Sequence, residues 1–144
     1  MADRDEAGQP EPDPEFAPFE RLFRRVPVWD VIGDSVNDTA LPSPSFSVNR
    51  EKYSSARDVL KGYEGFRVAA FLVSDIPCDV VGSDGHRYRM GVEHEPVAEN
   101  YSHSGVHTFQ EDIKLTEKPP KHVRKKLRDL LRRGVKVLAL ESPN

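Results

Sequence analysis

The segment GVEHEPVAENYSHSGVHTF, from Gly91 to Phe109, contains three of the chain's five histidines and two glutamates that flank one of them. Side chains on a β-strand alternate between its two faces, and the second half of this segment has that alternation. An extended chain would place five side chains on a common face: Tyr101, His103, Gly105, His107 and Phe109. We therefore predict a strand there, with an aromatic and imidazole face.

A helix is the alternative for the same residues. It would place His103 and His107 four positions apart on one face, which is the spacing that a helical zinc site uses. Gly105 and the β-favouring residues that follow it disfavour a helix. On a strand the two imidazoles would be about 13 Å apart, because the rise is about 3.3 Å per residue. We therefore expect no metal site and no cofactor.

Histidines of this segment could also act as the base and the acid of a metal-independent ribonuclease. Imidazole titrates near neutral pH and can both take and give a proton. The candidate catalytic residues are His94, His103 and His107. Glu93 and Glu95 would raise the pKa of His94 if both are ionised and close to it. The competing interpretation is that these histidines are ordinary hydrogen-bonded side chains of a sheet.

Length and composition indicate one domain that does not cross a membrane. A chain of 144 residues can build a core that folds without disulfides. No run approaches the ~20 apolar residues of a membrane helix, and the N-terminus lacks the basic and then apolar order of a signal peptide. We therefore expect a cytoplasmic protein. The single cysteine, Cys78, excludes a disulfide framework and is expected to be a buried thiol.

Charge is distributed unevenly along the chain, although the net charge is only −3. Residues 1–20 contain seven acids, one base and four prolines, and such a segment buries too little apolar surface to offset the entropy of ordering. We therefore predict a disordered acidic tail over residues 1–19 and a single domain over residues 20–144. Lys118 to Lys136 contains nine Lys or Arg residues against one acid, so the tail could fold back on the basic end.

Apolar alternation and turn residues predict the remaining elements. Strands are expected at Leu22–Val26 (alternatively a short helix), Ser45–Asn49, Phe66–Val73, Asp79–Val81, Tyr88–Val92, Asn100–Ile113 (one strand or a pair) and Val135–Leu140. Ser54 or Ser55 is expected to cap a short helix. Trp29 is expected to anchor the core. The predicted fold class is α+β: a mixed or antiparallel sheet of five to six strands packed by one or two helices.

The best-defined element is a helix that Pro120 opens and Gly134 ends. Its apolar stripe is formed by Val123, Leu127, Leu130 and Leu131. Its back carries five candidate anion-binding residues: Lys121, Arg124, Lys125, Arg128 and Arg132. Clustered cations on one helix face are typical of phosphate binding. The leading hypothesis is a small binding or accessory protein that contacts nucleic acid or an acidic protein partner through this helix, although no base-reading motif is present.

A second enzymatic hypothesis comes from the order of residues in the N-terminal half. Arg24 or Arg25, then Ser45-Phe46-Ser47, then Glu93 or Glu95 resembles the Arg, Ser-x-Ser, Glu order of ADP-ribosyltransferase-like NAD-binding folds. The resemblance covers about six residues. It implies that Arg25 contacts the cofactor, that Ser45 and Ser47 support its pocket, and that the glutamate orients the ribose.

The wider layout has a resemblance of its own. It combines SFSVNR at residues 45–50, EHEP at 93–96, NYSH at 100–103 and the closing basic helix. This layout resembles that of small bacterial proteins without an established activity, and it spans most of residues 21–138. The resemblance implies a bacterial source and no particular function. Sequence alone leaves the oligomeric state open.

Overall fold

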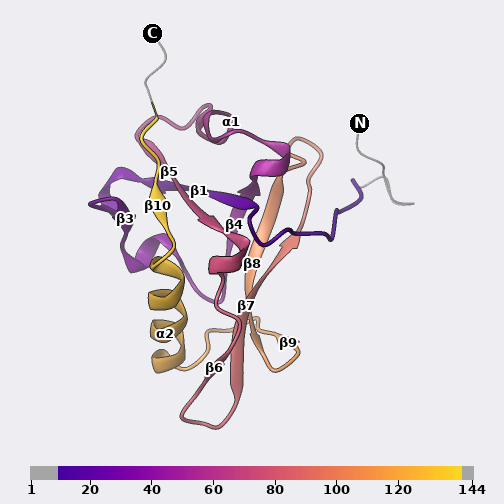
Figure 1. Ribbon diagram of the computed structural model, residues 1–144, viewed down its shortest axis with the longest axis vertical. Helices are drawn as coiled ribbons and strands as arrows, with labels where there is room; N and C mark the ends of the chain where they lie inside the picture. The colour runs from indigo at the N-terminus through magenta and orange to yellow at the C-terminus, as the bar shows by residue number, and fades with distance from the viewer. Residues whose placement is uncertain (1–9, 141–144) are drawn as a thin grey trace.

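The computed structural model describes residues 10–140 (Figure 1). Its longer strands are β1 (Arg21–Pro27), β4 (Ser45–Arg50), β5 (Phe66–Leu72), β7 (Arg87–His94) and β8 (His103–Gln110). Two-residue strands are β2 (Val31–Ile32), β3 (Ser35–Val36), β6 (Val80–Val81), β9 (Ile113–Lys114) and β10 (Lys136–Val137). The α-helices are α1 (Ala56–Leu60) and α2 (Lys121–Arg132). Single 3-10 turns are η1 (Val28–Asp30), η2 (Asp38–Ala40), η3 (Glu51–Tyr53) and η4 (Val73–Asp75).

The main sheet has eight strands in the order β10-β5-β1-β4-β8-β7-β6, with β9 paired to β8. All of its pairings are antiparallel, and β2 and β3 form a separate two-stranded ribbon. The α+β class is therefore confirmed, but the predicted count of five to six strands is too small. Strands β6 and β10 lie within the predicted segments Asp79–Val81 and Val135–Leu140, and the segment Asn100–Ile113, expected as one strand or a pair, forms β8 and the start of β9.

The larger core lies between one face of the sheet and α2. Leu22 and Val26 of β1 point into it, and the helix contributes its predicted apolar stripe of Val123, Leu127 and Leu131. These three helix residues are at most 1% exposed. Burying one leucine side chain contributes about 1.5–3 kcal/mol to folding, so the stripe holds α2 against the sheet. None of the helices in the described part of the chain combines the length and the apolar character needed to span a membrane.

The opposite face of the sheet is covered only in part. Helix α1 is capped by Ser55, one of the two serines predicted for this role, in a capping box: Ser55 accepts from Asp58 N and the Asp58 carboxylate accepts from Ser55 N. Its Val59 packs with Phe23, Val68 and Ala70 in a second, smaller core. These partners belong to β1 and β5. The same face of β4, β8 and β7 therefore extends beyond the helix, and it carries the polar side chains described below.

Two expected core residues lie on the surface instead. Trp29 is 76% exposed, because it sits in the η1 turn beyond the end of β1, where the strand no longer directs it to the core. Cys78 is also exposed, in the connection before β6. The prediction of a core tryptophan and that of a buried thiol were therefore wrong.

The acidic tail predicted over residues 1–19 divides into two parts. Residues 1–9 lie outside the described residues. Residues 10–19 pack against the domain, where main-chain atoms of Asp13 and Glu15 accept hydrogen bonds from the buried Arg50. In Figure 1 this indigo segment runs past the β8 side of the sheet and away from α2. This part of the tail therefore folds back on β4 and its neighbours and not on the basic helix.

Candidate functional site

The β7–β8 hairpin sets the positions of the acidic and imidazole side chains on the exposed sheet face. Its register pairs Gly91 with His107 and Glu93 with Gly105. In this block of four residues the glycines occupy one diagonal, while His107 and Glu93 occupy the other. Side chains on one face at diagonal positions are close enough to interact when they are long. His107 and Glu93 can therefore lean toward each other over backbone that carries no side chain.

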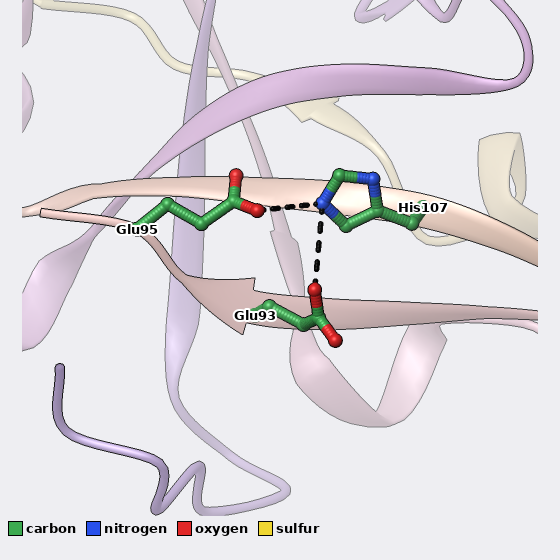
Figure 2. A group of neighbouring side chains, drawn as sticks. All are labelled: Glu93, Glu95 and His107. Carbon is green, nitrogen blue, oxygen red and sulfur yellow. Dashed lines mark hydrogen bonds and ion pairs between the residues drawn. The ribbon is translucent and has the colours of Figure 1, made fainter. Parts of the chain in front are cut away.

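His107 contacts two carboxylates (Figure 2). Its Nε2 is 2.9 Å from Glu95 Oε2 and 3.7 Å from Glu93 Oε1. Lys114 Nζ donates to Glu93 Oε1, so this carboxylate lies between two basic groups. The four side chains form a cluster of two carboxylates, one imidazole and one ammonium group that is partly open to solvent: His107 is 16% exposed, and Glu93 and Glu95 are about 40% exposed.

Gly105 makes the contact between His107 and Glu95 possible. A Cβ added at Gly105 would collide with Glu95 Oε1 and would lie 2.7 Å from His107 Nε2. The carboxylate and the imidazole therefore occupy the space that a side chain would take. On the other side of Gly105 and His107, strand β4 contributes Ser47 and Ser45 in register, and both are exposed. The cluster is thus surrounded by small residues on the sheet face.

This arrangement could hold a divalent metal ion. Glu93, Glu95 and His107 each offer one ligand atom, and these atoms all lie within 4.8 Å of one another. One imidazole nitrogen and two carboxylate oxygens suit Zn²⁺ or Mn²⁺, and three protein ligands leave positions for water or substrate. Histidine spacing in the sequence pointed only to histidine ligands and so missed this set. The sequence does contain the two segments, E-x-E at residues 93–95 and G-x-H at residues 105–107. Their contact can be inferred only once the register of the hairpin is known.

His103 lies on the same face as His107, as the predicted alternation requires. Its Nδ1 is 2.9 Å from the main-chain oxygen of Glu95, and no contact between the two imidazoles is present among the described residues. The predicted separation along the strand keeps them apart. His103 therefore helps to hold the end of the hairpin next to the cluster.

His94 lies on the opposite face of β7 and is 6% exposed. Its Nδ1 accepts a hydrogen bond from Asp13 N at 2.7 Å, and its Nε2 is 2.5 Å from the main-chain oxygen of Tyr101. Burial lowers the pKa of His94. The increase expected from Glu93 and Glu95 does not occur, because neighbours on a strand point to the other face. The three candidate catalytic histidines are therefore not brought together.

The residues of the NAD hypothesis are also divided. Ser45 and Ser47 lie beside the cluster, next to His107 and Gly105. Arg25 points toward α1, where its Nη1 donates to the main-chain oxygen of Val59 at 3.1 Å and its guanidinium lies 3.8 Å from the centre of the Tyr63 ring. Its positive charge therefore lies under α1 and not beside the two serines. Arg24, the alternative arginine, donates to the main-chain oxygen of Ser47 at 2.8 Å and lies over the Phe46 ring.

The five predicted anion-binding residues of α2 differ in their partners. Arg128 and Arg132 both pair with Asp38 of η2, the former at 3.5 Å. Lys125 pairs with Asp129 at 3.1 Å, one turn along the helix. Arg124 is partly buried, and its Nε makes no hydrogen bond to the described residues. Lys121 is exposed and makes no ion pair within residues 10–140. Three of the five cations are thus partly neutralised by the protein itself.

The chain matches no protein-family model, and comparisons with curated proteins and with solved structures return no match. The candidate functions that follow therefore depend on the residues of this chain: the cations of α2 and the cluster on the exposed sheet face.

Proposed function

We propose that the protein binds a polyanion, either nucleic acid or an acidic protein surface, through the solvent-facing cations of α2. The supporting observation is the surplus of positive charge. Lys118 to Lys136 contains nine Lys or Arg residues. Within residues 10–140, the carboxylates paired with these cations are those of Asp34, Asp38 and Asp129. A surplus of this size over one stretch of chain, with α2 at its centre, attracts phosphate or carboxylate groups from outside the molecule.

Exposure to solvent favours four of these cations as the residues that contact the anion. Lys121, Lys125, Lys126 and Arg133 are exposed. Arg128 and Arg132 lie closer to the core and share Asp38, so they contribute less to the external field. The bound anion is therefore expected to lie along the exposed lysines. Phosphate contacts of this kind carry no sequence information, so binding should depend on charge and salt and only weakly on base sequence.

Binding of labelled single-stranded RNA and double-stranded DNA, followed by fluorescence anisotropy at several salt concentrations, tests the proposal. Each phosphate contact contributes about −0.9 to the slope of log K against log salt for duplex DNA. The triple variant Lys121→Glu, Lys125→Glu, Lys126→Glu should lose at least about tenfold in affinity. Its slope of log K against log salt should be shallower by the contribution of about three phosphate contacts. The same measurements with poly-glutamate distinguish a nucleic acid from an acidic protein as the partner.

A matched control reverses two exposed cations far from α2 in the sequence, as Lys61→Glu and Arg67→Glu. This control should bind as the wild type does. Equal affinity of the triple variant and the wild type would reject the role of α2, and an equal loss in the control would show that net charge alone is responsible.

A second candidate function is metal binding on the exposed sheet face, favoured by the convergence of Glu93, Glu95 and His107. We propose that these three residues bind a divalent ion, which would replace the direct contact between His107 and Glu95. The bound ion would act as a Lewis acid and would lower the pKa of a bound water. Ser45, Ser47 and Lys114 lie beside it and would contact a substrate or its leaving group.

Titration calorimetry with Zn²⁺ and with Mn²⁺ tests this candidate. His107→Ala and Glu95→Gln should each weaken binding at least about tenfold, because each removes a ligand. His86→Ala removes an exposed imidazole elsewhere and should leave the affinity unchanged. Metal binding that survives in both cluster variants would show that the ion binds at another place.

A further inference from the structure

Among residues 10–140 the largest fully buried side chain is a charged one, Arg50 at the end of β4. Its guanidinium makes a two-pronged contact with the Glu20 carboxylate, at 2.7 Å from Nε and 2.8 Å from Nη2. Its remaining donors reach main-chain oxygens of the N-terminal segment: Nη1 to Asp13 O at 2.7 Å and Nη2 to Glu15 O at 2.5 Å. The Phe16 ring covers it, with its centre 3.8 Å from the guanidinium carbon. Arg50 therefore holds the N-terminal segment through the main-chain oxygens of Asp13 and Glu15.

A second set of groups binds one side chain of this segment, that of Asp13. Lys52 Nζ donates to Asp13 Oδ2 at 2.7 Å and Tyr53 Oη donates to the same atom at 2.5 Å. These two hydrogen bonds are the main reasons why the pKa of Asp13 is lowered. Asp13 N donates to His94 Nδ1, so the main chain and the side chain of this residue are both held.

The side chains that bind the N-terminal segment belong to the folded domain and pack against one another. The Tyr53 and His94 rings stack, with centroids 5.5 Å apart and an angle of 5° between their planes. Tyr101 packs edge-on against both rings at 4.7 Å, and its hydroxyl donates to the main-chain oxygen of Glu11 at 2.7 Å. The segment itself has no strand or helix over residues 11–16. The surface formed by Arg50, Lys52, Tyr53, His94 and Tyr101 thus holds an extended segment through main-chain contacts and one carboxylate.

We propose that Arg50, Lys52, Tyr53, His94 and Tyr101 form a recognition site for an extended acidic peptide, and that the chain's own residues 11–16 occupy this site until an acidic segment of a partner protein displaces them. Two features support a partner in place of a purely internal contact. The site binds main-chain atoms, a single carboxylate and one aromatic ring, so an extended peptide with an acid and a ring at this spacing satisfies it. The five side chains of this surface are cationic or aromatic, which complements an acidic peptide.

The internal segment has a concentration advantage over a partner. A short flexible tether gives an effective concentration in the millimolar range, so an external peptide competes poorly while Asp13 is anchored. Removing the anchor should therefore reveal binding that the wild type conceals. This inference does not depend on α2 or on the Glu93–Glu95–His107 cluster.

The test uses the full chain and a fluorescein-labelled peptide with the sequence of residues 10–19, PEPDPEFAPF. Asp13→Ala removes the carboxylate anchor, and Asp13→Ala with Phe16→Ala also removes the ring that covers Arg50. Glu20 is kept in both variants, so that Arg50 retains its buried partner. Anisotropy should show at least about tenfold tighter peptide binding by the variants than by the wild type. Glu15→Gln, which keeps the main-chain contact, is the matched control and should bind as the wild type does.

Further measurements of affinity, folding and oligomeric state decide between the possible results. A peptide with Ala in place of its Asp should lose at least about tenfold in affinity, and Lys52→Ala in the Asp13→Ala background should do the same. If the double variant does not fold by circular dichroism, the single variant carries the test. No binding by a folded variant, or equal binding of the two peptides, would overturn the proposal. A dimer of the variant by light scattering that the peptide does not dissociate would assign the site to a second copy and would also overturn it.

Discussion

His94 accepts a hydrogen bond from the main-chain N–H of Asp13 through Nδ1, at 2.7 Å. Since Asp13 N is a donor, Nδ1 must carry a lone pair, and the proton of the neutral ring is then on Nε2, which faces the Tyr101 carbonyl. A protonated ring would direct a second N–H at the Asp13 N–H. The docked position of the N-terminal segment thus requires a neutral His94.

This requirement predicts a pH dependence of stability. Burial lowers the pKa of His94 below its usual 6.5, so the unfolded chain binds this proton more readily than the folded chain does. Its contribution to stability is complete above pH 6.5 and is lost as the pH falls through the lowered pKa. The nearby charged groups are Arg50, Asp13 and Glu20, of which Asp13 has a lowered pKa and stays ionised in this range.

Urea unfolding at pH values from 7.5 to 5 measures the effect. The wild type should lose stability below pH 6.5, whereas His94→Asn keeps an acceptor that does not titrate and should show a flatter profile. His86→Asn removes an exposed histidine whose ring accepts no main-chain hydrogen bond from the described residues, so this variant should follow the wild-type profile. Equal profiles for His94→Asn and the wild type would contradict the assignment.

Substitution of Gly105 tests the geometry of the sheet cluster. In Gly105→Ala the new Cβ meets Glu95 Oε1 and His107 Nε2, so one of these side chains must move. We expect the contact between His107 and Glu95 to be lost at a cost of no more than about 1 kcal/mol in the free energy of unfolding, because the atoms that collide are the ends of partly exposed side chains. In the background Glu95→Ala, His107→Ala the space is free, and the same substitution should cost much less. An equal cost in both backgrounds would place the strain in the strand backbone.

The helix α2 should owe its position to its apolar stripe. Leu127 is 1% exposed within the larger core, and Leu127→Ala is expected to destabilise the protein by about 2–5 kcal/mol in urea unfolding. Lys125→Ala, two positions earlier on the exposed face, should change stability by no more than about 0.5 kcal/mol. A loss at Leu127 no larger than that at Lys125 would mean that α2 does not stabilise the sheet.

Local patterns predicted much of this fold, and long-range complementarity explains what they missed. Alternation placed His103 and His107 on one face of β8, and the 3.6-residue period identified Val123, Leu127 and Leu131 as the buried stripe. Both signals belong to single elements. The meeting of His107 with Glu95 depends on a register between two strands, which no single-strand pattern contains.

The N-terminal segment shows the same limit. Its composition, rich in acids and prolines, predicts disorder, because that rule weighs only the apolar surface that a segment can bury. Residues 10–19 are held mainly by the buried Arg50, together with Lys52, Tyr53 and His94, which are remote in sequence. A single arginine in SFSVNR gives no sign in the sequence that its guanidinium is covered on all sides. Such a partner is visible only in three dimensions.

Asp38 provides the sharpest test of the polyanion proposal. Its carboxylate pairs with both Arg128 and Arg132, so it lowers the positive field of α2 from outside the helix. Asp38→Asn removes the carboxylate that both guanidinium groups share, although Arg132 keeps Asp129 at 3.7 Å. It should increase affinity for duplex DNA several-fold, with the largest gain at low salt, where screening is weakest. Asp34→Asn removes the partner of Lys136, beyond the end of the helix, and should have a smaller effect. If Asp38→Asn left DNA affinity unchanged while the α2 lysine variant lost it, the anion would contact the exposed lysines alone; if neither changed it, α2 would not be the binding surface.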